Sequence, residues 1–73
     1  MSTDAPMDPK EIFELIVEAG EKLKYSTDAN MAQRREQAIE LLVQARDAAR
    51  EAGVAPLVEQ AETRLADLDA ADR

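Results

Sequence analysis

Residues 30–53 read NMAQRREQAIELLVQARDAAREAG, and this stretch decides the fold. Its apolar side chains recur with the period of an α-helix, in which each residue advances by about 100°. Counted from Ala38, they fill an arc of about 220°, whereas a helix that lies on one neighbour needs an arc nearer 100°. The apolar set is Ile39, Leu41, Leu42, Val43, Ala45, Ala48, Ala49 and Ala52. The pattern therefore predicts a central helix with neighbours on more than one side.

Another helix is predicted before this stretch, beginning just after Asp8 and running to about Lys24. A capping box is indicated at residues 8–11, DPKE, with an Asp for the N-cap, a Pro for the first helical position and a Glu for the third. Met7 and Ile12 occupy the two positions of a hydrophobic staple across that cap. These local signals favour a well-defined helix start.

The turn after the central helix is predicted at Gly53, because glycine tolerates the positive φ that often follows a C-cap. Val54 can then contact Ala49 across the turn, as in a Schellman motif. Pro56 suits the first position of a third helix. We expect that helix to end near Leu68.

Residues 25–29 form a polar break between the first two helices, and residues 30–33, NMAQ, favour a second capping box. No strand pattern is present. The predicted fold class is all-α, a small three-helix bundle at residues 8–69. We expect residues 1–7 to be a disordered leader and residues 70–73 to be a frayed tail.

The spacing of small and apolar residues resembles that of the tetratricopeptide repeat, a helix-turn-helix unit that builds protein-binding surfaces. The residues that match are Ile16, Ala19, Gly20, Leu23, Ala38, Leu42, Ala45, Val58, Ala61 and Leu65. The signature Trp and Tyr of the repeat are missing, the turn is about six residues too long, and no Pro closes the unit. The resemblance implies an antiparallel hairpin followed by a capping helix, and an ordinary three-helix bundle is the alternative.

The composition limits the chemistry that this chain can perform. Its 73 residues include no Cys and no His, so the usual zinc ligands and the commonest general base are absent. The net charge of −7 argues against binding to a nucleic-acid backbone. No apolar run approaches the roughly 18 residues of a membrane span, and the first residues lack the features of a signal peptide. We expect a cytoplasmic protein with no cofactor, no nucleic-acid partner and no membrane association.

Two polar groupings are candidates for chemistry. The first helix carries an acidic stripe at helical spacing: Glu11, Glu14, Glu18 and Glu21. A carboxylate metal centre in a helical bundle also recruits His, so we expect a solvated face and no metal site. Ser26, Thr27 and Asp28 lack a base to activate a nucleophile, which favours turn and capping roles. We therefore predict that the chain is not an enzyme.

The first two helices are expected to pair as a hairpin with two distinct sides. One side carries Leu15, Ala19, Leu41, Ala45, Ala48 and Ala52. The third helix is expected to cover it, because Ala48 and Ala52 keep that side apolar at the end of the central helix. The other side would then stay open as a groove with two arginines at its rim. The residues predicted to bind a partner there are Phe13, Val17, Ile39, Val43, Arg46 and Arg50.

These features predict a non-enzymatic protein–protein interaction module, a small adaptor or an accessory subunit. Its partner would be another protein or a second copy of itself. Each of the four apolar side chains exposed in the groove would contribute on the order of 1.5–3 kcal/mol of binding free energy if it were fully buried. The alternative is an acidic inhibitor, such as an antitoxin or a nucleic-acid mimic that blocks a basic surface. That function needs an unbroken negative surface, and this surface is interrupted by Arg34, Arg35, Arg46 and Arg50.

Overall fold

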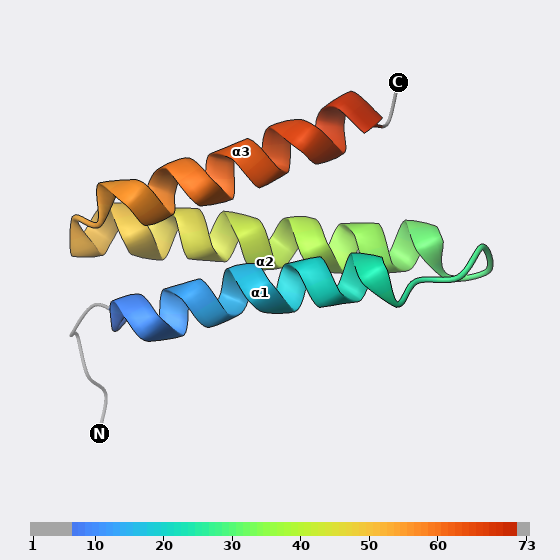
Figure 1. Cartoon of the computed structure of the whole chain (residues 1–73), viewed down its shortest axis with the longest axis horizontal. Coiled ribbons are helices and arrows are strands. Elements are labelled where there is room, and N and C mark those ends of the chain that lie inside the picture. The colour runs from blue at the N-terminus through green and yellow to red at the C-terminus, as the bar shows by residue number, and fades with distance from the viewer. Residues whose placement is uncertain (1–6, 72–73) are drawn as a thin grey trace.

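The structure, a computed structural model, describes residues 7–71 and is built from three helices. They are α1 (Pro9–Lys24), α2 (Met31–Ala52) and α3 (Ala55–Ala71). Helix α2 lies in the middle and runs antiparallel to both of the others, which pack mainly against it (Figure 1). The described chain contains no strand and measures 40 × 26 × 14 Å. The prediction of a small all-α bundle is confirmed.

The start of α1 is closed by its own side chains, as predicted. The Asp8 carboxylate accepts a hydrogen bond from the Lys10 backbone N–H at 3.3 Å. In return, the Asp8 N–H donates to the Glu11 carboxylate at 3.1 Å. Met7 is half-buried against the core, and Ile12 is fully buried within it. The capping box stabilises the first turn of α1 through hydrogen bonds within residues 8–11.

The N-terminal capping of α2 differs from the prediction. Asn30 is the N-cap, but its side chain makes no cap hydrogen bond, so the expected capping box at residues 30–33 is wrong. The Asn30 side-chain oxygen instead accepts from the Thr27 backbone N–H at 2.7 Å. The Ser26 hydroxyl donates to the Leu23 carbonyl at 2.8 Å. These short polar side chains stabilise the connecting loop, which competes with the helix for their hydrogen bonds.

The turn between α2 and α3 has the geometry predicted for Gly53. This residue has φ 75° and ψ 29°, and its N–H donates to the Arg50 carbonyl at 3.2 Å. The Val54 N–H donates to the Ala49 carbonyl at 2.9 Å, which completes a Schellman motif. Helix α3 begins one residue before Pro56, which therefore takes the second helical position, where its missing N–H also leaves no bond unmade.

Helix α3 also ends later than predicted, because it continues past Leu68 to Ala71. Of the predicted tail at 70–73, Ala70 and Ala71 therefore belong to the helix, and the last two residues lie outside the described chain. Of the predicted leader at 1–7, only Met7 is described.

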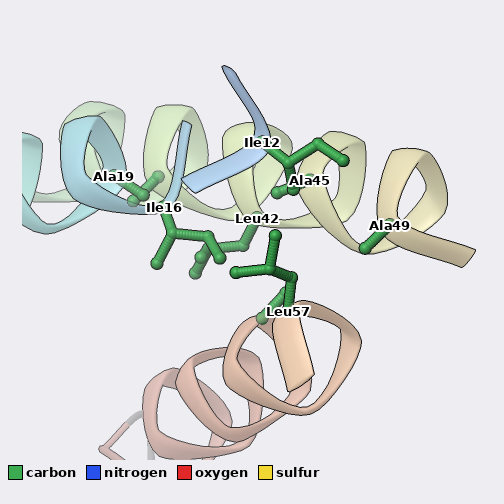
Figure 2. Close-up of a cluster of buried hydrophobic side chains, with 9 residues drawn as sticks. Ile12, Ile16, Ala19, Leu42, Ala45, Ala49 and Leu57 are labelled. Carbon is green, nitrogen blue, oxygen red and sulfur yellow. The ribbon is translucent and has the colours of Figure 1, made fainter. Parts of the chain in front are cut away.

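The core lies where all three helices meet. Leu57 points from α3 toward the side chains of Ile16 on α1 and Leu42 on α2 (Figure 2). The buried side chains are Ile12, Ile16, Ala19, Ala38, Leu42, Ala45, Ala49, Leu57 and Ala61. More than half of them are alanines, which allow helix backbones to approach closely but bury little apolar area.

Helix α3 packs along the arginine-bearing edge of α2. The Arg50 guanidinium lies 2.7 Å from the Glu62 carboxylate of α3. Further along, Arg35 donates to the Leu68 backbone carbonyl at 3.1 Å, near the C-terminal end of α3. Both contacts cross from α2 to α3, so the expectation that α3 covers the opposite edge is wrong.

The edge expected to lie under α3 is instead only partly covered. Leu41, Ala48 and Ala52 are half-buried against the core. Leu41 also lines an open hollow whose walls come from α1 and α2 alone. The apolar character of the last turn of α2 therefore does not decide where α3 goes. The Schellman turn at Gly53 sets the direction in which the chain leaves α2. Arg35 and Arg50, on the edge that α3 covers, then bond to acceptors on α3.

Candidate protein-binding surface

Two exposed large apolar side chains lie one helical turn apart on α1. Phe13 is 48% exposed and Val17 is 43% exposed. Both line an open hollow of about 800 Å³ that follows the solvent side of the helix. The other residues of its lining are Lys10, Glu14, Glu18, Glu21, Lys22, Tyr25 and Arg34. We call this set of residues the α1 face.

The helical period places Phe13 and Val17 away from the core. Ile12 and Ile16 are buried against α2, and each successor is rotated by about 100° around the helix axis. Phe13 and Val17 are these successors, so they point out of the core together. The capping box at residues 8–11 starts the helix just before them. The α1 face is therefore carried by a helix whose first turn is well fixed.

The acidic side chains of the α1 face have no interaction partner within the described chain. No hydrogen bond or ion pair within residues 7–71 engages the carboxylates of Glu14, Glu18 and Glu21. These three lie at helical spacings of four and three, so they form one stripe beside Val17. At the C-terminal end of α1, the ammonium of Lys24, which is not part of this face, lies 5.6 Å from the centroid of the Tyr25 ring. The α1 face thus combines solvent-exposed apolar side chains with carboxylates that have no partner in the described chain.

The structure does not bring the six predicted partner-binding residues into one groove. Ile39 and Val43 are half-buried on α2, and neither lines the hollow that contains Phe13 and Val17. Ile39 lines a separate hollow of about 430 Å³ with polar residues of α2. Helix α3 lies along the edge of α2 that carries Arg35 and Arg50, while Phe13 and Val17 remain open on the solvent side of α1.

The two arginines predicted for the rim of the groove have partners within the chain. The Arg46 guanidinium lies 3.1 Å from the carboxylate of its neighbour Asp47. Arg50 pairs with Glu62, and both side chains are about half exposed. Arg50 therefore helps to hold α3 against α2 in this structure, which differs from the role in binding predicted for it.

Tyr25 is the residue of the α1 face that the sequence interpretation missed. It is 65% exposed and follows the last residue of α1, where it had been counted only as part of a polar break. An aromatic side chain directly after a helix, outside the apolar stripe of that helix, was the available signal. Its position extends the apolar part of the α1 face beyond Val17.

The structure places the other polar candidates in structural roles or in solvent. The Ser26 hydroxyl and the Thr27 backbone N–H make the loop hydrogen bonds described above, as expected for turn residues. No group of three or more potential metal ligands occurs among the described residues. Across residues 7–71, none of the helices has the length and apolar character needed to cross a membrane.

Comparisons with known proteins do not add a relative. No protein-family model, no curated protein and no solved structure matches this chain.

Proposed function

We propose that this chain is a non-enzymatic protein–protein interaction module that binds its partner through the α1 face. The observation that carries the proposal is the exposure of Phe13 and Val17, which lie side by side in one hollow. Full burial of such side chains stabilises by about 1.5–3 kcal/mol each. Since each is roughly half exposed, a partner that covered both would gain on the order of 1 kcal/mol from each.

The inventory of side chains supports a binding role. With no His and no Cys, the chain lacks the residues that most often act as general bases, nucleophiles or zinc ligands. Apolar side chains that are exposed next to each other and rimmed by charges are typical of protein-binding sites. A binding module, acting as a small adaptor or an accessory subunit, fits this combination best.

An acidic inhibitor or nucleic-acid mimic is the competing function, and the free carboxylates of the α1 face favour it. Such a protein would bind through charge alone, so its binding would weaken steeply with added salt. A partner that covers Phe13 and Val17 would be held largely by apolar burial, with a shallow dependence on salt. Measuring the affinity for the partner as a function of salt concentration therefore distinguishes the two functions.

The test compares Phe13→Asp and Val17→Asp with a matched control, Met31→Asp. Met31 is 50% exposed and lies outside the α1 face, at the first position of α2, where an acidic residue suits the helix. Each variant and the unaltered chain are used to capture partners from the native cell. Sedimentation equilibrium measures self-association at the same time.

We expect a stoichiometric partner to be retained by the unaltered chain and by Met31→Asp. The same partner should be lost, with at least about a tenfold drop in affinity, for Phe13→Asp and Val17→Asp, which is about 1.4 kcal/mol. Circular dichroism checks that all three variants remain helical. Equal binding by all variants would show that the α1 face is not the site.

A further inference from the structure

The charges of the α1 face select one kind of partner for the site proposed above. Its basic residues are Lys10 and Lys22, which stand toward the two ends of the hollow, and Arg34, which comes from α2. Glu14 and Glu18 stand in the middle beside Val17. A segment that covers Phe13 and Val17 must therefore also lie against these carboxylates. Whether they help or oppose binding depends on the charge of that segment.

A second copy of this chain is a poor occupant. A two-fold axis brings the same patch of both copies together, so an axis through the middle of the α1 face would set its carboxylates against each other. Like charges directly opposed across an interface destabilise it. Each copy also carries a net charge of −7, which adds long-range repulsion. Self-pairing about such an axis would thus oppose like charges across a small apolar contact.

We propose that the α1 face binds a basic amphipathic segment of another protein, an inference that rests on the function proposed above. Two apolar side chains about one helical turn apart would cover Phe13 and Val17. Lys or Arg side chains on one flank would meet Glu14, Glu18 and Glu21, none of which has a partner within the described chain. Arginine suits this stripe best, because its guanidinium can bind a carboxylate with two parallel hydrogen bonds.

The test is a selection that does not presuppose the partner. A random library of 16-residue displayed peptides is selected on the full chain and counter-selected on F13S/V17S. The counter-selecting variant keeps every charge, so peptides held by charge alone are removed. Circular dichroism confirms that it stays helical, as expected for two exposed positions. Surviving peptides are sequenced, synthesised and titrated against the chain.

Two triple variants then separate local from long-range charge. One is Glu14→Gln/Glu18→Gln/Glu21→Gln on the α1 face. The matched control is Glu36→Gln/Glu51→Gln/Glu59→Gln, which removes the same charge from exposed positions of α2 and α3. We expect the surviving peptides to carry a net positive charge and two apolar residues at a spacing of three or four. Their affinity should fall at least tenfold on the first triple variant and less than threefold on the control.

The possible failures are distinct. Surviving peptides that are neutral or acidic, or that lose equal affinity on both triple variants, would overturn the basic partner and leave the α1 face as a binding site. If no peptide survives the counter-selection, Phe13 and Val17 do not form a binding site and the proposed function itself fails. Self-association of the unaltered chain that F13S/V17S abolishes would show that a second copy is the occupant.

Discussion

Two glycines of this chain have opposite roles at the scale of the residue. Gly53 has φ 75°, and apart from its two neighbours in the chain no residue lies within 4 Å of the position that a Cβ would occupy. Only backbone conformation therefore makes glycine necessary there. Gly20 lies inside α1, where an added Cβ would meet the Arg64 guanidinium at 4.0 Å, an ordinary contact distance. Gly20 is thus free to change, whereas Gly53 is not.

We expect Gly53→Ala to lower the free energy of unfolding by about 1–2 kcal/mol, because an L-residue is strained at positive φ. Gly53→Pro should cost more, since it fixes φ near −65° and removes the N–H that donates to Arg50. Gly20→Ala is the control and should raise the stability by roughly 0.5–1 kcal/mol. Urea denaturation measures all three. A neutral Gly53→Ala would argue against the left-handed turn.

At the scale of the element, the starts of α1 and α2 look alike in sequence but differ in structure. Both have a short polar N-cap residue, Asp8 and Asn30. Asp8 bonds forward into its helix, while Asn30 bonds backward to Thr27 in the loop. The same residue type can serve either a helix or a turn, and the loop geometry decides between them.

We therefore expect Asp8→Ala to destabilise the chain by about 0.5–2 kcal/mol, the usual cost of losing an N-cap. Asn30→Ala should cost less, because it removes only a loop hydrogen bond in an exposed position. Thermal unfolding followed by circular dichroism ranks the two variants. Amide hydrogen exchange should show faster exchange in the first turn of α1 for Asp8→Ala alone. The reverse ranking would mean that Asn30 caps α2 in solution.

The packing of α3 belongs to the scale of the whole molecule. Two arginines of α2 reach α3, and they differ in what they contact. Arg35 donates to a backbone carbonyl in a partly buried position, and Arg50 pairs with a carboxylate in an exposed one. Exposed ion pairs contribute little to stability, whereas a hydrogen bond shielded from water contributes about 1 kcal/mol. Arg35 should therefore matter more for holding α3.

We expect Arg35→Met to destabilise the chain by about 1 kcal/mol and to speed amide exchange in the last turns of α3. Arg50→Met, which makes the same change of side chain, should cost less than about 0.5 kcal/mol. Native-state hydrogen exchange gives both values. If α3 packed on the opposite edge of α2, neither variant would alter exchange in α3.

Because the core is small, the whole molecule has little stability to lose when a core residue is substituted. Leu42 and Ile12 are its two largest fully buried side chains, and most of the other core residues are alanines. Leu42→Ala should cost about 2–5 kcal/mol. A loss of that size approaches the total stability of a domain of this size, so most of the helical circular dichroism should disappear. Met31→Ala, at an exposed position, should leave the signal unchanged.

Local signals account for what could be predicted of the fold. The Asp8 cap, the turn at Gly53 and the buried stripe of α2 each depend on residues close together in sequence, and the structure contains all three. Phe13 and Val17 are exposed, as predicted, but they line a hollow on the solvent side of α1 that contains neither Ile39 nor Val43. Asn30 was misjudged because its hydrogen-bond partner lies in the loop before it.

The sequence by itself determined the three helices and the apolar stripe by which each one packs, because caps, turns and periodicity act within a few residues. Only the tertiary structure decided which edge of α2 is covered by α3. That choice depends on the exit angle at Gly53 and on contacts such as Arg35 with the Leu68 carbonyl, which join residues 33 positions apart. It separated Ile39 and Val43 from the hollow of Phe13 and Val17 and left the α1 face open. Periodicity shows which residues of a helix face a neighbour, but the identity of the neighbour on each side is settled only when the helices pack.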